Sequence, residues 1–400
     1  MRRFPEVVLG SSLARVGEQM VAIAMVLFVL TTYHSAPLAG LVGFLSIFPG
    51  LVFAPLAGAL LDRHGRKWLI IIDYLIAMLT IGLIGLLALA HLLPIWLLLL
   101  ITGVSSLSAP LGNVGMRTLF PLIVPRHLWE RANAVDSNGY VVASLFGPAL
   151  AGAIVGFLGG PAALLATASL FGVAALVLTR IDDPPTTMAS SGKLIRDAWD
   201  GVVYVFRNAS LRGIALSLGI GNIGGGMMYI ALPVLVLQRF HQGPVTVGAL
   251  FAVLGGAGLV TATLAGRMRT EGIERQMLGV PQAVFGLGLA SLAFAPNLAV
   301  VVAALAFMGM AIGPSDIALF TLRQRRTDPN WMGRAFAVSM SLNFAGFPVG
   351  AVIGGRLVSW SLPGTLLVGA ALLLVAAIIP FVAIPKTGDL PAEGLPLTPG

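Results

Sequence analysis

Long apolar runs constrain this chain more than any other feature of its sequence. A helix needs about 20 apolar residues to cross a bilayer, and the 400-residue chain contains about twelve runs of that order. They lie at residues 7–31, 40–61, 68–90, 95–117, 133–158, 162–179, 210–236, 245–266, 277–295, 298–320, 335–358 and 363–384. Only 10% of the residues are charged, whereas soluble domains carry about 25%. We therefore expect an all-α membrane protein with about 12 transmembrane helices.

The basic residues follow a topological pattern. If the N-terminus is inside, all of the 24 Lys and Arg lie in cytoplasmic segments except Arg15, Arg239 and Arg356. The positive-inside rule then places both termini in the cytoplasm and the protein in the cell (inner) membrane. We interpret the net charge of +8 as this topology signal, with anionic membrane lipid as its partner, and nucleic acid is not needed to explain it.

Composition and spacing exclude several classes of chemistry. The chain has no cysteine, so disulfides, thiolate metal sites and cysteine nucleophiles are ruled out. The five histidines show no metal-ligand or triad spacing, and no Walker motif is present. Gly219, Gly221 and Gly224 match G-x-G-x-x-G, but they lie inside an apolar run rather than between a strand and a helix. We expect no enzyme, no cofactor and no metal site.

The sequence contains an internal repeat. A shift of 208 residues aligns Gly40 with Gly248 and Gly50 with Gly258, and a shift of 203 aligns Arg131 with Arg334, Gly147 with Gly350 and Gly152 with Gly355. Two registers this similar indicate two pseudo-symmetric six-helix halves in parallel. We assign residues 1–180 to the first half, 181–209 to a cytoplasmic linker, 210–385 to the second half and 386–400 to a disordered cytoplasmic tail.

The linker contains one amphipathic stretch, from Leu194 to Asn208. Leu194, Ala198, Val202, Val205 and Phe206 share one side, and Arg196, Asp200 and Arg207 lie away from it. This pattern predicts a helix at the cytoplasmic membrane interface.

A charged turn separates the second and third runs. It reads Gly58-Ala59-Leu60-Leu61-Asp62-Arg63-His64-Gly65-Arg66-Lys67. Gly65 permits a reversal with positive φ, and a carboxylate such as Asp62 is favoured at a helix N-terminus. This turn resembles the loop between helices 2 and 3 of the major facilitator superfamily. The resemblance implies a latch in which Asp62 holds the helix beginning near Arg334 when the carrier faces outward. The alternative is a surface turn with topology charges only.

Other charged residues near the cytoplasmic ends are expected to serve the same latch. These are Asp73, Arg117 and Asp136.

The fifth run contains Gly147-Pro148-Ala149-Leu150-Ala151-Gly152. This stretch resembles the G-P-x-x-G-G signature of superfamily exporters, although Ala151 stands where the first of the paired glycines is expected. Small residues allow helix backbones to approach closely, and proline permits a kink. The resemblance implies export, and the alternative is ordinary small-residue packing.

Glu18 is the most informative single residue. It lies about eleven residues into the first run, which is roughly 16 Å along a helix and near the centre of the bilayer. An acid there costs several kcal/mol unless it is paired, hydrated or neutral. Arg15 lies on the same helix face. We expect Glu18 and Arg15 to take part in proton or substrate coupling; the alternative is a structural Arg15–Glu18 pair.

The tenth run contains Gly313-Pro314-Ser315-Asp316, where proline frees a backbone carbonyl. Asp316 either faces the cavity as a second coupling candidate or pairs with Arg323 as a cap. The resemblance implies a cavity lined by helices 1, 4, 7 and 10. The candidate cavity residues are Gln19, Ala22, Met25, Ser105, Ser108, Asn113, Asn222, Met227, Tyr229 and Ser315.

The first run, the segment Arg131-Ala132-Asn133-Ala134 and the linker helix together resemble a bacterial exporter branch of the superfamily that includes macrolide and enterobactin exporters. We therefore expect a monomeric, proton-driven exporter of small, partly apolar molecules, such as drugs or a siderophore-like metabolite. One alternative is an uptake symporter or facilitator for a small nutrient. An alternative from another class is a non-transporting membrane scaffold or sensor.

Overall fold

The structure is a computed structural model that describes residues 4–124, 129–181, 194–265, 272–328 and 331–386. Within these ranges it is helical and contains no β-strand. The first part of the chain forms α1 (Phe4–Thr32), α2 (Ala36–Leu45), α3 (Phe48–His64), α4 (Arg66–Leu89), α5 (Ile95–Ser106), α6 (Ala109–Ile123), α7 (Trp129–Leu158) and α8 (Gly160–Thr179). After α9 (Leu194–Arg207), the chain forms α10 (Ala209–Val234), a π-helical turn (Leu235–Arg239), α11 (Pro244–Ala265), α12 (Glu274–Ala293), α13 (Leu298–Met310), α14 (Ile312–Arg325), α15 (Met332–Val358) and α16 (Leu362–Ala383).

The predicted fold class is confirmed. In the described ranges, 11 helical stretches are long and apolar enough to cross a membrane, and Val142–Leu158 of α7 is a shorter apolar one. Three predicted spans are each two helices with a break between them: α2 and α3, α5 and α6, and α13 and α14. A proline follows each break within the first turns of the next helix, where its missing N–H removes no helical hydrogen bond.

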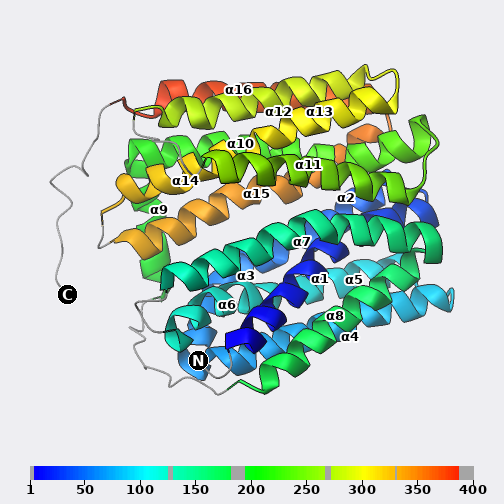
Figure 1. Ribbon diagram of the computed structural model, residues 1–400, viewed down its shortest axis with the longest axis horizontal. Coiled ribbons are helices and arrows are strands. Elements are labelled where there is room, and N and C mark those ends of the chain that lie inside the picture. Colours follow the sequence, from blue (N-terminus) through cyan, green and yellow to red (C-terminus); the bar gives the residue numbers. More distant parts are fainter. Residues whose placement is uncertain (1–3, 125–128, 182–193, 266–271, 329–330, 387–400) are drawn as a thin grey trace.

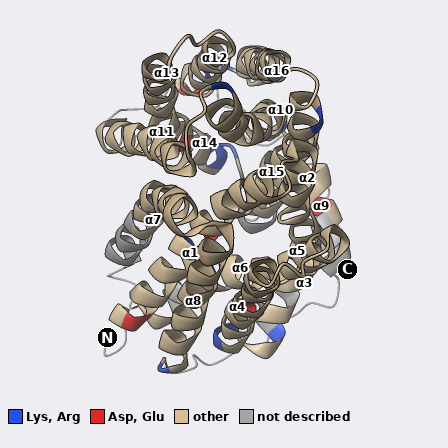
Figure 2. Ribbon diagram, turned by 90° about the vertical axis from the view of Figure 1, so that its right-hand side faces the viewer, with Lys and Arg blue, Asp and Glu red and all other residues tan. Residues whose placement is uncertain are grey.

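The helices form two bundles that lie side by side. Most of α1 to α8 lies in the lower part of Figure 1 and α10 to α16 in the upper part, and α16 ends at the left (Figure 1). The end-on view of Figure 2 shows that α2 lies next to α15 and α7 next to α11. We call the left side of Figure 1 the terminal end and the right side the opposite end. The domain limits at residues 180 and 210 stay a prediction.

Glycines bring the two bundles together near the opposite end. A Cβ added at Gly40 on α2 would lie 3.0 Å from Cα of Gly355 on α15, and one at Gly152 on α7 would lie 2.8 Å from Cα of Gly248 on α11. These four glycines are two pairs of the sequence repeat. Backbone approaches this close require small residues at both positions. The α2–α15 and α7–α11 contacts therefore repeat each other across the two bundles.

Helix α9 docks on the second bundle through a narrow strip. Tyr204 is only 4% exposed; its ring stacks on Trp331 with centroids 4.9 Å apart, and its hydroxyl oxygen accepts a hydrogen bond from the Asp328 backbone N–H at 3.0 Å. Val205 is also buried, whereas Phe206 and Trp199 are 43% and 66% exposed. Val205 therefore packs on the second bundle while Phe206, predicted on the same apolar side, is exposed; the interfacial position of the helix stays a prediction.

Replacing Tyr204 with alanine is expected to weaken this docking by about 3–5 kcal/mol, the usual cost of removing a buried aromatic side chain. Tyr204→Phe keeps the stacked ring and loses only the hydrogen bond, which costs about 1 kcal/mol. Thermal unfolding in detergent, followed by tryptophan fluorescence, measures both variants. Equal midpoints for the two would show that the stack with Trp331 contributes nothing.

Candidate functional site

A polar pocket lies within the first bundle, at the middle of the molecule. It is lined by Ser11, Arg15 and Glu18 from α1, Tyr74 from α4, Gly112, Asn113, Met116 and Arg117 from α6, and Tyr140 from α7. Glu18 lies at the middle of the 29-residue α1. The expected mid-membrane position of this acid therefore coincides with a pocket whose walls come from four helices.

Charged groups of both bundles lie within electrostatic range of Tyr140 in this pocket. The electrostatic neighbours of Glu18 include the guanidinium groups of Arg15 and Arg117. Tyr140 is 49% exposed and lies within electrostatic range of these three groups and of Asp316 on α14. Asp316 is itself exposed. The three predicted coupling residues, Glu18, Arg15 and Asp316, are thus brought together around one tyrosine at the junction of the bundles.

Arg323 does not form the predicted alternative pair with Asp316. Its side chain is fully buried and points from α14 toward α15. There the guanidinium lies 5.3 Å from the ring of Phe336, donates to Sδ of Met340, and lies 2.8 Å from the side-chain oxygen of Asn343 once that amide faces it. Among the described residues it has no carboxylate partner. Asp316 is left free to face the cavity.

The predicted cavity residues separate into several environments. Asn113 lines the pocket, Ser108 lies beside Asp73, and Ser105 hydrogen-bonds Thr80 at 2.8 Å. Gln19 packs against Gly147, and the Asn222 amide donates a hydrogen bond to the Asn343 backbone carbonyl at 2.9 Å. Met25 and Met227 are buried, Ser315 is partly buried and Ala22 is exposed. Tyr229 packs between Phe251 and Phe347, with ring centroids 5.5 and 5.3 Å away, and its hydroxyl has no hydrogen-bond partner among the described residues.

The predicted latch is only partly described. The side chains of Asp62 and Asp136 lie outside the described part of the chain, as do those of Arg131 and Arg334. Gly65 has the expected positive φ, 88°, between α3 and α4. Gly58 and Arg66 are partly buried, Arg63 is exposed, and Lys67 is buried with its ammonium 4.9 Å from the ring centre of Trp68. Asp73 and Arg117 lie at the polar pocket.

The residues of the export-signature motif lie at the bundle junction. Pro148 is inside α7, and its carbonyl oxygen would lie 2.6 Å from a Cβ added at Gly248. Gly152 makes the close contact with α11 described above, and Gly147 receives the side chain of Gln19. The motif thus packs α7 against both α1 and α11.

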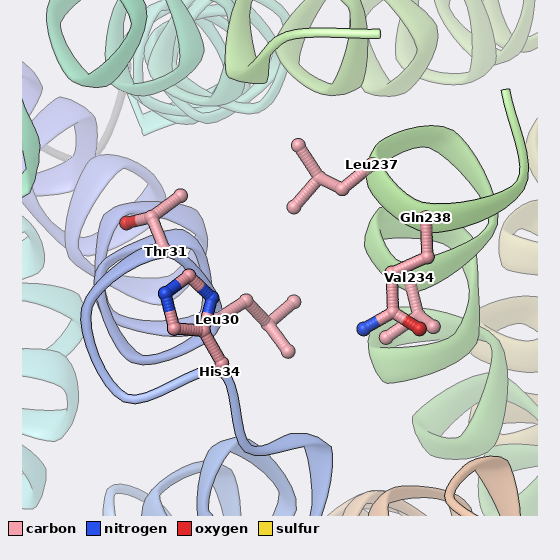
Figure 3. A pocket seen from close by; sticks show the side chains of 6 residues that line it. All are labelled: Leu30, Thr31, His34, Val234, Leu237 and Gln238. Atoms are coloured by element: carbon pink, nitrogen blue, oxygen red, sulfur yellow. The ribbon is translucent and has the colours of Figure 1, made fainter. Parts of the chain in front are cut away.

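A second pocket lies near the opposite end, between α1 and the end of α10. It has a volume of about 290 Å³ and is lined by Leu30, Thr31, His34, Val234, Leu237 and Gln238. Figure 3 shows the α1 residues facing those of α10 and the π-helical turn across this space. The Thr31 hydroxyl donates to the Leu27 carbonyl at 2.8 Å, so His34 and Gln238 supply the accessible polar groups. We did not predict this pocket, because its residues carry no motif.

Sequence reasoning also missed Tyr74, Met116 and Tyr140 in the polar pocket. None of the three belongs to a motif, and their neighbours Asp73, Arg117 and Asp136 were interpreted as members of the latch. Tyr140 carried one usable signal, since a tyrosine one turn after Asp136 is unusual in an apolar run.

Comparisons with known proteins agree with this fold. The family model described as Major Facilitator Superfamily matches residues 7–346 and, in a second match, 214–398. The chain is 35% identical to the uncharacterized MFS-type transporter y4rN of Sinorhizobium fredii, over 97% of this chain and 95% of that protein. It is 26% identical to the multidrug efflux pump Tap of Mycobacterium tuberculosis, over 88% and 86% of the two chains.

Among solved structures, the nucleoside transporter NupG superposes with a TM-score of 0.76 at 12% identity, over 95% of this chain and 98% of that chain. Identity this low supports the fold alone. The resemblance inferred from the loop and helix motifs is confirmed at the level of the family.

Proposed function

Because this chain belongs to the major facilitator superfamily, it is a multi-pass membrane transporter, and we propose that it exports small, partly apolar compounds in exchange for protons. The similarity to a multidrug efflux pump supports the direction of transport and the substrate class. Protons and the transported compound are then its partners, and it works without a cofactor.

The setting of Glu18 carries the proposal. A carboxyl at the middle of a membrane-spanning helix is costly and is found at ion and substrate pathways. Here it lines a pocket with Arg15 and Arg117. When Glu18 releases a proton, the two guanidinium groups stabilise its carboxylate, so this acid can change its charge inside the membrane. Glu18 would release its proton as the substrate binds, and would take up another after the substrate leaves.

Alternating access supports the same proposal. The glycine contacts close the bundles against each other near the opposite end, whereas the polar pocket lies between that closure and the terminal end. The positive-inside rule assigns the terminal end to the cytoplasm. In this arrangement the pocket would collect substrate from the cytoplasm or the inner leaflet.

Replacing Glu18 with glutamine is expected to abolish proton coupling. Purified protein in proteoliposomes is tested with ethidium as a lipophilic cation, erythromycin as a macrolide and a catecholate siderophore. In the wild type we expect at least one compound to move protons. Coupling free energies of 1–3 kcal/mol correspond to about 5–150-fold effects, so we expect accumulation driven by a pH gradient to fall about tenfold or more in Glu18→Gln.

Glu6→Gln is the matched control, since it makes the same change in the first turn of the same helix, outside the pocket. Coupling lost in Glu18→Gln and kept in Glu6→Gln supports the proposal. Normal coupling in Glu18→Gln would reduce Glu18 to a structural partner of Arg15 and make Asp316 the next candidate. A wild type that transports without moving protons would favour the uptake or facilitator alternative.

A further inference from the structure

A second acid is buried behind the pocket that holds Glu18. Asp73 lies two turns inside α4, about 10 Å from its first residue, and is only 4% exposed. Within the described residues no Lys or Arg forms an ion pair with it. Acids buried in membrane-spanning helices are expensive and mark functional sites unless they are structurally paired. The position of Asp73 therefore needs an explanation.

The surroundings of Asp73 fit a carboxyl group. The Ser108 side chain and the Gly112 backbone N–H lie within hydrogen-bonding reach of it. The Ser108 hydroxyl is also 3.0 Å from the Ser105 carbonyl, so it donates to one of these two acceptors at a time. A Cβ added at Gly112 would collide with Oδ2 of Asp73. Glycine at this position thus leaves the space that the carboxyl occupies.

The same glycine joins Asp73 to the pocket. Gly112 and Tyr74, the chain neighbour of Asp73, both line the pocket that contains Glu18. Asp73 and Glu18 are close enough to repel each other electrostatically. The remaining titratable groups of the pocket are Arg15, Arg117 and Tyr140, besides Tyr74. The neighbouring helices α5 and α8 contain no titratable residue.

We propose that Asp73 is a second proton-binding residue of the Glu18 site rather than a member of the cytoplasmic latch. This inference rests on the proposed function. Two acids that repel each other bind protons as a pair, so the first proton is shared between them. Each proton comes from water in the pocket, adds to a carboxylate oxygen and returns to water after the conformational change. No other bond is made or broken. Ser108 switches between the Asp73 carboxylate and the Ser105 carbonyl as Asp73 changes charge.

The test compares Asp73→Asn with wild type, using ethidium in proteoliposomes with and without a pH gradient. Asparagine keeps the size of the side chain and its contacts with Ser108 but cannot ionise. We expect ethidium accumulation driven by the pH gradient to fall about tenfold relative to wild type. The pH dependence of ethidium binding is expected to become shallower, which a merely structural role would not produce.

Two further variants keep the inference testable if Asp73→Asn fails to fold. Gly112→Ala leaves every charge in place but displaces the Asp73 carboxyl, so it is expected to lower coupling. Gly103→Ala, in the same membrane span, is the matched control, because its added Cβ meets only Leu45 at 3.8 Å. Asp200→Asn on α9 controls for the loss of an acid outside the pocket.

The outcomes separate this inference from the proposed function. No proton movement in the wild type with any tested compound overturns both. Coupling that depends on Glu18 but is unchanged in Asp73→Asn and in Gly112→Ala overturns only the role of Asp73. Coupling lost in Asp73→Asn or Gly112→Ala but kept in Gly103→Ala and Asp200→Asn supports it.

Discussion

Replacing Gly40 and Gly152 together with alanine is expected to prevent closure of the opposite end and to lower transport at least tenfold. The Cβ added at Gly152 would lie 2.6 Å from the Pro244 carbonyl oxygen and 2.8 Å from Cα of Gly248. The one added at Gly40 would collide with the Ala351 carbonyl oxygen. These are backbone atoms, so the helices themselves must separate. Such overpacking costs about 1–3 kcal/mol at each contact, or about 2–6 kcal/mol if the two contacts are independent.

The added Cβ atoms destabilise the conformation described here, in which the opposite end is closed, and do not destabilise a conformation in which that end is open. The conformational equilibrium should therefore shift by 10-fold or more, since about 1.4 kcal/mol corresponds to a factor of ten. The chain has no cysteine, so Asn113→Cys provides a single reactive thiol in the pocket. We expect its labelling by a membrane-impermeant maleimide to fall from the side of the terminal end and to rise from the other side.

Gly103→Ala serves again as the control for this substitution. Wild-type transport and labelling in the double variant would show that the α2–α15 and α7–α11 contacts do not separate during the cycle. Loss of transport with unchanged labelling would indicate general misfolding instead. Each single variant is expected to give about half of the free-energy shift, because the two contacts are related by the sequence repeat.

These glycines also show how far the sequence could predict the fold. The two repeat registers aligned Gly40 with Gly248 and Gly152 with Gly355, but they did not indicate that Gly40 would meet Gly355. A repeat relates equivalent positions, whereas a contact depends on how the two bundles are oriented. The close approaches repeat in the backbone. A Cβ added at Gly355 would lie 2.6 Å from the Ala36 carbonyl oxygen, and one added at Gly152 would lie 2.6 Å from that of Pro244, 208 residues after Ala36.

The spans themselves could be predicted because lipid requires long apolar helices, and that signal needs no tertiary information. The breaks within them were harder. Pro314 predicted a disturbed backbone ladder in the tenth span, and the break between α13 and α14 lies just before it, at Ala311; the breaks between α2 and α3 and between α5 and α6 were not predicted. Hydropathy averaged over a window of about 20 residues does not register one or two residues that leave the helix.

The candidate site was predicted in part for the same reason. The depth of Glu18 follows from its position in the first span, and Arg15 follows from helical spacing. The other walls of the pocket come from α4, α6 and α7, and the sequence does not show how these helices are rotated relative to α1. Asp73 was therefore assigned from its distance to the loop, although its side chain lies against Gly112.

Replacing Arg323 with methionine is expected to raise the stability of the protein in this conformation. The Arg323 side chain is fully buried. Among the described residues, its guanidinium contacts the ring of Phe336, the Met340 sulfur and the Asn343 amide. Its Nε has no hydrogen-bond partner. A buried charge without a counter-ion is costly, and exchanging buried charges for apolar side chains of similar volume is neutral or stabilising by about 1–4 kcal/mol. Methionine is of similar length and adapts to irregular space.

Arg323→Ala is the contrasting variant, since it removes the same charge but leaves a cavity that costs about 2–5 kcal/mol. Thermal unfolding in detergent should therefore rank Arg323→Met at or above wild type and Arg323→Ala below it. Arg323→Met below wild type would show that the contacts with Phe336 and Asn343 compensate the charge fully. Transport adds a second result: a more stable Arg323→Met that no longer transports ethidium would mean that the charge is needed in another conformation. In that other conformation the guanidinium would contact an anion. The free-energy cost of burying its charge in the present conformation would then favour the transition to the other one.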